Sequence, residues 1–295
     1  MHDLVPQMLL SGFVLASRYA LVGTGFFLIL ALCRFIHFAH GAFVPVAAYS
    51  AFVAGMWLSM PVPVCALAGI VVAAALGCLM ELSVYRPLRR KRASTLILML
   101  ASIGIYAVLQ NSISLVFGDD TKSIRSGVVE EGLNVLGARI TPIQITTICV
   151  SIALVIALAL FLRNTKIGQA MRAVANDPEL ASVSGIDSDR VILWAFAIGS
   201  ALAGVAGILV ALDVDMTPTM GLNALMMGVV AVIIGGANSI PGIALGALLL
   251  GMAQQFGVWW ISSQWQDAIA FIILLAFLLF RPQGFMGRKV KKAVV

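Results

Sequence analysis

Long apolar segments alternate with short polar ones along almost the whole chain. The apolar segments cover residues 8–31, 42–60, 62–84, 93–117, 142–162, 191–212, 222–236, 242–261 and 266–280. A helix needs ~20 predominantly apolar residues to span the hydrocarbon core of a bilayer, and most of these segments approach that length. The pattern therefore predicts an all-α polytopic membrane protein with about eight to nine transmembrane helices, in a single domain covering residues 1–295.

Two short sequences rich in glycine and polar residues interrupt or border the apolar segments. The first break is RFIHFAHG (34–41), and the second break is GGANSIPG (235–242). Paired interruptions in the two halves of a membrane protein indicate discontinuous helices near a transport path and a weak internal repeat. We therefore expect path residues in these breaks, namely His37, His40, Gly41, Gly235, Gly236 and Asn238.

One polar segment, the 163–190 loop, is longer than a simple turn requires. Asp177 followed by Pro178 predicts a helix start, because Asp is a good N-cap and Pro suits the first helical position. Gly185 predicts the end of that helix. Residues 167–175 also have helical composition, so we expect two short helices that meet at residues 176–177.

The second of these short helices has an apolar face, formed by Leu180, Val183 and Ile186. A solvated linker needs neither a capped helix pair nor such a face. An apolar helix face flanked by charges instead suits docking into a groove on a soluble partner.

Composition and charge place this loop relative to the membrane. Of all residues, 61% are hydrophobic and 11% are charged, which excludes an ordinary soluble domain. Most of the 19 basic residues lie in 86–92, in the 163–190 loop and in the C-terminal tail. The positive-inside rule therefore predicts a cytoplasmic loop and C-terminus, an external 118–141 loop and an external N-terminus. The basic clusters lack interleaved aromatic residues, so we expect no nucleic-acid partner.

Few ionisable side chains interrupt the apolar segments. Glu81 lies within about one turn of Arg86, which predicts a local ion pair near the cytoplasmic interface. Arg18 could extend its charged end to an interface. His37 and His40 are spaced i, i+3, which suits either hydrogen bonds at a helix end or the lining of a path. No carboxylate or cysteine lies near them in sequence, so we predict no metal site.

No phosphate-binding loop of the GxxxxGK[ST] type occurs in the sequence. The chain therefore does not bind ATP in the manner of P-loop proteins. Any use of ATP energy must reach this chain from a partner.

Several sequence motifs, in a fixed order, together carry a family resemblance. They are RFIHFAHGAF (34–43), VYRPLRRKR (84–92), ASIGIYAVLQN (101–111), IGQAMRAVANDPELASVSGID (167–187), FAIGSALAGVAGIL (196–209), GGANSIPG (235–242) and RPQGFMGR (281–288). With these motifs the chain resembles, over nearly its whole length, the permease subunits of bacterial ATP-binding-cassette importers for branched-chain amino acids. It is most similar to the H-type member of the permease pair.

The resemblance implies a role for the 163–190 loop as the element that couples ATPase closure to movement of the spans. The loop residues that match the family are Gly168, Arg172, Ala173, Asp177, Pro178, Glu179, Ala181 and Gly185. It also implies a second permease subunit, two cytoplasmic ATPase subunits that bind ATP and Mg, an external solute-binding protein and the bacterial inner membrane. No cofactor and no catalytic residue is expected in this chain.

Three positions depart from the family pattern. The segment 221–235 often carries a Lys in the family but has none here, His37 replaces the usual Asn, and Asn238 stands in the GGANS sequence. These departures leave two alternatives open for the function. One is an importer of urea or short amides with the same architecture. The other is an ion-coupled secondary transporter, which would place carboxylates in mid-span.

Overall fold

The computed structural model describes residues 4–124, 132–135, 137–237 and 239–287 of the 295-residue chain. The long helices are α1 (Leu4–Cys33), α2 (Phe43–Leu58), α3 (Val62–Met80), α5 (Thr95–Phe117), α6 (Pro142–Asn164), α9 (Ser188–Asp213), α10 (Met220–Gly235), α11 (Ile240–Trp260) and α12 (Gln266–Phe280). The short elements are α4 (Arg86–Arg90), α7 (Lys166–Asn176), α8 (Pro178–Val183), the 3-10 turns η1 (Phe38–Ala42) and η3 (Ser263–Trp265), and the π-helical turn η2 (Glu81–Tyr85).

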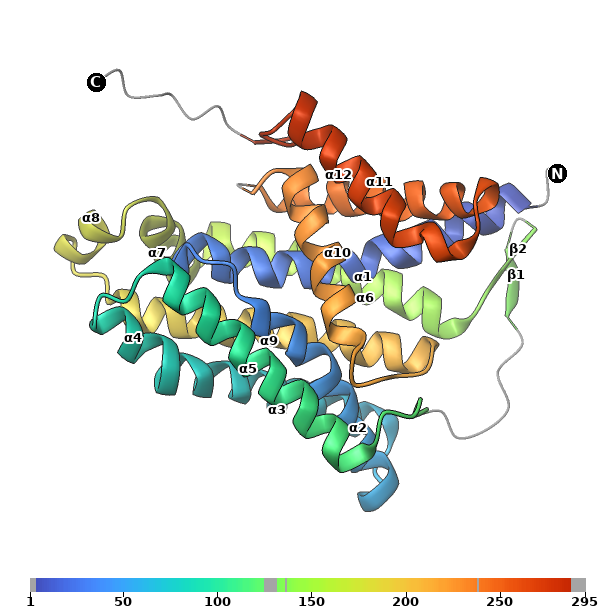
Figure 1. Cartoon of the computed structure of the whole chain (residues 1–295), viewed down its shortest axis with the longest axis horizontal. Coiled ribbons are helices and arrows are strands. Elements are labelled where there is room, and N and C mark those ends of the chain that lie inside the picture. The colour runs from blue at the N-terminus through green and yellow to red at the C-terminus, as the bar shows by residue number, and fades with distance from the viewer. Residues whose placement is uncertain (1–3, 125–131, 136, 238, 288–295) are drawn as a thin grey trace.

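Within the described residues, eight helices are long and apolar enough to cross a membrane. This confirms the all-α polytopic class. The apolar segment 222–236 is helical as well, but α10 has 16 residues and is not among the eight. α2 and α12 are counted because η1 and η3 extend them to 21 and 18 residues. Figure 1 shows α10 running across the long axis of the bundle, whereas most other long helices follow that axis.

Polar residues define where several helices begin. Ser94, Thr141, Thr165, Asp177 and Asp187 each accept a hydrogen bond from a backbone N–H in the first turn of the helix that follows. Such caps satisfy N–H groups that have no partner inside the helix. The apolar helices therefore start at fixed positions although their composition alone would let them shift.

α1 and α9 form the centre of the bundle and are its most buried spans, whereas α12 is the most exposed. α1 packs against α6, α9, α10 and α11, and α9 packs against α2 and α3. The largest apolar cluster joins these helices and includes Leu21, Ile29, Ala47 and Phe196.

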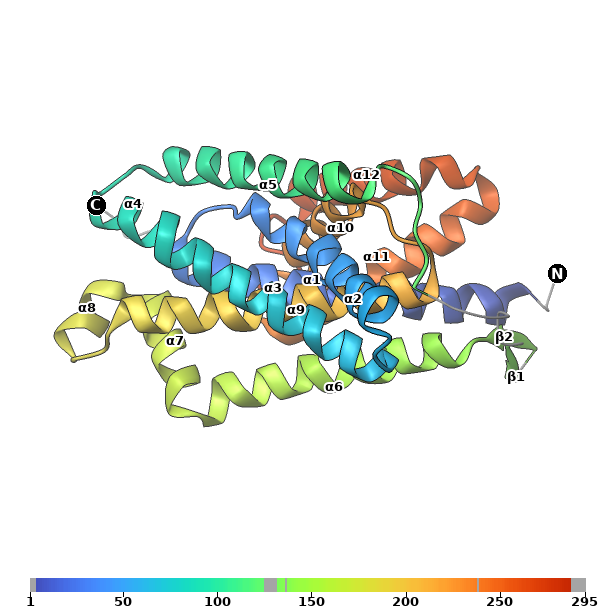
Figure 2. The same cartoon turned by 90° about the horizontal axis from the view of Figure 1, so that it is seen from below.

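The two ends of the bundle differ. α4, α7 and α8 lie at one end, and the opposite end carries a small antiparallel hairpin of β1 (Leu133–Val135) and β2 (Ala138–Ile140) (Figures 1 and 2). The basic 86–92 cluster and the 163–190 loop therefore share one end, and the described part of the 118–141 loop lies at the other. The hairpin was not expected from the sequence.

Two charged residues of the apolar segments form ion pairs. Arg18 pairs with Asp213, so its charged group lies beside the end of α9. The partner expected for Glu81 is wrong. Glu81 pairs with Arg89 and not with Arg86. The π-helical turn that starts at Glu81 changes which later residues share its face, so Arg89, two turns further on, reaches the carboxylate.

Candidate functional site

The 163–190 loop folds into the helix pair α7 and α8. α7 starts at the N-cap Thr165, whose Oγ1 accepts a hydrogen bond from Gly168 N at 3.0 Å. Asp177 ends α7 and caps α8, and its Oδ1 accepts hydrogen bonds from Glu179 N and Leu180 N, each at 3.0 Å. The predicted pair of helices and the predicted cap are therefore confirmed.

α8 ends as the glycine predicted. Gly185 has φ +81°, a conformation that residues with a Cβ rarely adopt. The next residue donates back into the helix, from Ile186 N to Ala181 O at 3.0 Å. This is the Schellman arrangement, in which the residue after the glycine commonly packs against the helix. Ile186 is accordingly half-buried. The expectation that it belongs to an exposed apolar face is therefore wrong.

The remaining apolar residues of α8 point away from the bundle. Leu180 is 64% exposed and Val183 is 87% exposed. Of the other family-matching residues, Arg172, Asp177, Pro178 and Glu179 are exposed, Gly168 and Ala181 are buried, and Ala173 is half-buried. The buried positions hold the helix pair on the bundle, and the exposed ones form a surface free for contact.

Arginines from other segments hold the junction of α7 and α8 and the start of the helix that follows the pair. Arg34, in the first break, donates to Ala175 O at 3.3 Å and to Asn176 O at 3.1 Å, at the C-terminal end of α7. Asp189, in the first turn of α9, accepts from Arg86 Nε at 2.8 Å and from Arg90 Nη2 at 3.0 Å. A displacement of α7 and α8 would therefore act on the first break and on α4.

The first break is packed inside the chain. His37 and His40 are fully buried, and Gly41 is buried where η1 meets α10. His37 Nδ1 lies 3.1 Å from Ser102 Oγ on α5 and 3.2 Å from the Tyr85 hydroxyl. These contacts favour the hydrogen-bonding alternative for His37.

The second break forms the turn between α10 and α11. Gly235 and Gly236 are buried there, and the backbone of the tail contacts the turn through Phe285 N to Ile234 O at 2.9 Å and Met286 N to Gly235 O at 3.1 Å. Asn238 lies outside the described residues. The role of all these residues in a transport path stays a prediction.

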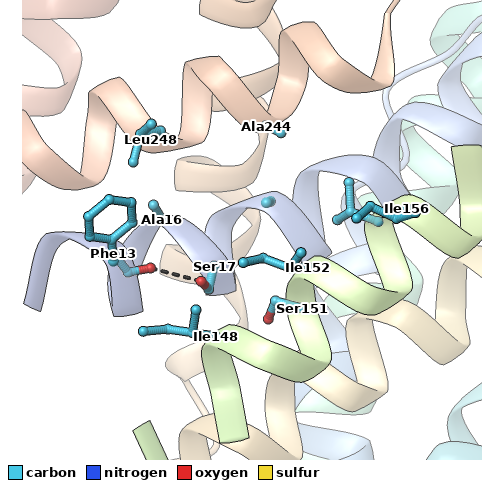
Figure 3. Close-up of a pocket in the computed structure, with 11 residues that line it drawn as sticks. Phe13, Ala16, Ser17, Ile148, Ser151, Ile152, Ile156, Ala244 and Leu248 are labelled. Carbon is cyan, nitrogen blue, oxygen red and sulfur yellow. Dashed lines mark hydrogen bonds between the residues drawn. The ribbon is translucent and has the colours of Figure 1, made fainter. Parts of the chain in front are cut away.

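An apolar groove of about 270 Å³ lies elsewhere, between α1, α6 and α11 (Figure 3). Its lining includes the hydroxyls of Ser17 and Ser151, but Ser17 Oγ donates to Phe13 O at 2.8 Å within α1. No charged side chain lines this groove. Its chemistry suits apolar chains and not a zwitterion or an amide, so we do not assign it to a polar solute.

A polytopic helical bundle that presents a capped, exposed helix pair at its basic end has the architecture of a transport permease. The family model described as "Branched-chain amino acid transport system / permease component" matches residues 8–278, and the chain belongs to this family.

Two permease proteins are similar to this chain over nearly its full length. The chain is 35% identical to the high-affinity branched-chain amino acid transport system permease protein BraD of Pseudomonas aeruginosa, covering 96% of this chain and 95% of the relative. It is 34% identical to the corresponding permease protein LivH of Escherichia coli, with the same coverage.

A solved structure shares the fold. The chain aligns with PsaBC from Streptococcus pneumoniae in complex with Fab, with a TM-score of 0.56 and 13% identity, over 96% of this chain and 93% of that one. The fold class and the family resemblance expected from the sequence are therefore confirmed.

Proposed function

We propose that this chain is one permease subunit of an ATP-driven importer for branched-chain amino acids. The observation that carries the proposal is the helix pair α7–α8, which is fixed to the bundle by buried residues and exposes Leu180 and Val183. Family membership supports the same function. ATP binding and hydrolysis then belong to partner subunits, because the sequence contains no phosphate-binding loop.

The proposed mechanism is alternating access. α8 rests in a groove of a cytoplasmic ATPase subunit, and closure of the ATPases on binding ATP and Mg displaces the helix pair. The bundle then changes the side to which its path opens. The change between the outward-open and inward-open states is driven by ATP and by the loaded binding protein, because each stabilises the two states to a different extent. This chain forms no covalent intermediate in the proposed mechanism.

The proposed assembly contains this chain, a second permease subunit that supplies the other half of the path, two ATPase subunits and an external solute-binding protein. In the bacterial inner membrane, α4, α7, α8 and the C-terminus would face the cytoplasm. The concentration of arginines in 86–90 at the end that carries α7 and α8 supports this orientation.

The experiment is uptake into proteoliposomes that contain this chain with its permease and ATPase partners and enclose ATP and Mg. Labelled leucine or urea is offered outside together with the binding protein. We expect leucine uptake that needs both enclosed ATP and the binding protein. Uptake of urea instead of leucine would identify the alternative cargo.

A protonophore distinguishes the remaining alternative. An ion-coupled secondary transporter loses uptake when the proton gradient collapses and keeps it without ATPase subunits. We expect the opposite on both counts. The buried carboxylate Glu81 lies towards the basic end of its span, where it pairs with Arg89, and not in mid-span. Protonophore-sensitive leucine uptake in the absence of the ATPases would overturn the proposal.

A further inference from the structure

A π-helical turn interrupts the long helix that precedes the basic cluster. α3 continues through η2 into α4 without a break in the helical path, so that residues 62–90 form one span. π-helical turns are rare and occur frequently at functional sites. Here the turn buries two polar side chains, Glu81 at its first position and Tyr85 at its last.

Glu81 is a fully buried carboxylate held by one guanidinium. Both of its oxygens accept from Arg89, and the Nη1 to Oε2 distance is 2.8 Å. The Arg89 side chain is 19% exposed, so the pair is largely removed from solvent. A buried ion pair of this kind adds little net stability compared with apolar residues of similar size.

Arg89 also faces the helix that follows the 163–190 loop. Its Nη2 lies 3.6 Å from Asp189 Oδ1, and Arg86 and Arg90 bind the other oxygen of the same carboxylate. Asp189 is the second residue of α9, directly after the segment that carries α8. Arg89 therefore contacts both Asp189, where the 163–190 loop enters α9, and the buried carboxylate of Glu81 in η2.

The other end of η2 contacts the first break. The Tyr85 hydroxyl lies 3.2 Å from His37 Nδ1, which in turn lies 3.1 Å from Ser102 Oγ. Ser102 Oγ also accepts from Ala39 N at 2.8 Å, which ties η1 to α5. The main packing partner of α5 among the described helices is η1, so this polar contact fixes α5 to the rest of the bundle.

We propose that Glu81 and Arg89 are positioning residues that transmit displacement of the 163–190 loop through η2 to the first break and α5. The proposal rests on the proposed function, because it needs an ATPase to displace the loop. The contacts run from Asp189 through Arg89 and Glu81 into one π turn, and from Tyr85 through His37 to Ser102. An ion pair suits such a link, since its charged groups hold one geometry or separate, whereas apolar packing can slide.

The experiment measures the number of leucine molecules imported per ATP hydrolysed by the reconstituted complex. The decisive variant combines Glu81→Met and Arg89→Met, which removes both charges but keeps side-chain volume, so the fold is retained. We expect ATPase subunits to co-purify and to hydrolyse ATP, while the leucine-to-ATP ratio falls about tenfold, in the usual range for coupling between sites.

Lys91→Ala is the matched control. Lys91 belongs to the same basic cluster, is exposed, and makes no described side-chain contact with Glu81 or Asp189. We expect this variant to keep the wild-type ratio. If the double methionine variant does not assemble, Glu81→Gln decides, because Gln keeps the size and one acceptor but loses the charge, and we expect a ratio several-fold below wild type.

A wild-type ratio in the double variant, or in Glu81→Gln where the double variant does not assemble, would overturn the inference. So would a parallel loss of uptake and hydrolysis that leaves the ratio unchanged, because that result indicates a merely structural role. Failure of ATP-driven leucine uptake in the wild-type complex would overturn the proposed function instead, so the two failures are distinguishable.

Discussion

Gly168 shows at the scale of one residue how the helix pair is fixed to the bundle. A Cβ placed there would lie 2.5 Å from Leu162 Cα and 2.9 Å from Phe161 C, so the corner between α6 and α7 admits no side chain. We expect Gly168→Ala to shift α7 at a cost of about 1–3 kcal/mol and to reduce co-purification of the ATPase subunits, while the chain still inserts into the membrane.

Gly104 on α5 is the matched control, since an added Cβ there would meet no heavy atom within 4 Å. Gly104→Ala should leave co-purification at the wild-type level. Equal amounts of ATPase recovered with both variants would show that the corner at Gly168 does not position the helix pair.

The ion pair between Arg18 and Asp213 links α1 to the end of α9 and is expected to affect the stability of the bundle. The two side chains are 12% and 9% exposed, so removing one charge leaves the other nearly buried and unpaired. We expect Arg18→Ala to lower the thermal unfolding temperature in detergent, at a cost of about 3–5 kcal/mol. The double variant Arg18→Met with Asp213→Leu should recover most of that loss. An unfolding temperature as low in the double variant as in Arg18→Ala would contradict this account.

At the scale of elements, α8 is the part of the chain whose exposed face is proposed to bind a partner. Burying one such side chain contributes about 1.5–3 kcal/mol. We therefore expect Leu180→Asp combined with Val183→Asp to weaken ATPase binding at least about a hundredfold, because each 1.4 kcal/mol is a factor of ten.

Ser182→Asp is the control for this change, because it adds a charge to the same helix at an exposed polar position. The Ser182→Asp variant should bind the ATPase with wild-type affinity. Binding constants from detergent-purified permease and ATPase would test this, and equal affinity of all three proteins would exclude α8 as the docking element.

The helix pair could be predicted from the sequence because its signals are local. Asp177 and Pro178 start α8 and Gly185 ends it, whatever surrounds the loop. The apolar spans could be predicted for a similar reason, since length and composition suffice. α10 is the exception, because its direction across the bundle is set by packing against α1 and α11 and by the turns at its ends.

The contacts around η2 could not be predicted, because each depends on residues far apart in the sequence. Glu81 reaches Arg89 only because a π-helical turn starts at Glu81. No residue in 81–85 predicts a π-helical turn from its type alone. Asp189 and Ser102 become partners of this region only after α9 and α5 have packed. The hairpin at 133–140 was missed because its strands have three residues each.

At the scale of the whole molecule, the protein has one end that is proposed to receive the ATPase and an opposite end that is not. α4, which carries Arg86, Arg89 and Arg90, lies at the first end with α7 and α8, and the β1–β2 hairpin lies at the second (Figure 2). We propose that the first end contacts the ATPase directly. A photo-crosslinking amino acid placed at either end reports such contact.

The most direct measurement places benzoyl-phenylalanine at Val183 on α8, or at Leu133 in the hairpin, in the intact complex. Both side chains are exposed, at 87% and 56%. We predict that illumination joins the Val183 variant to an ATPase subunit and does not join the Leu133 variant to one. An ATPase adduct from Leu133, or none from Val183 in a complex that contains the ATPase, would contradict direct contact between α8 and the ATPase.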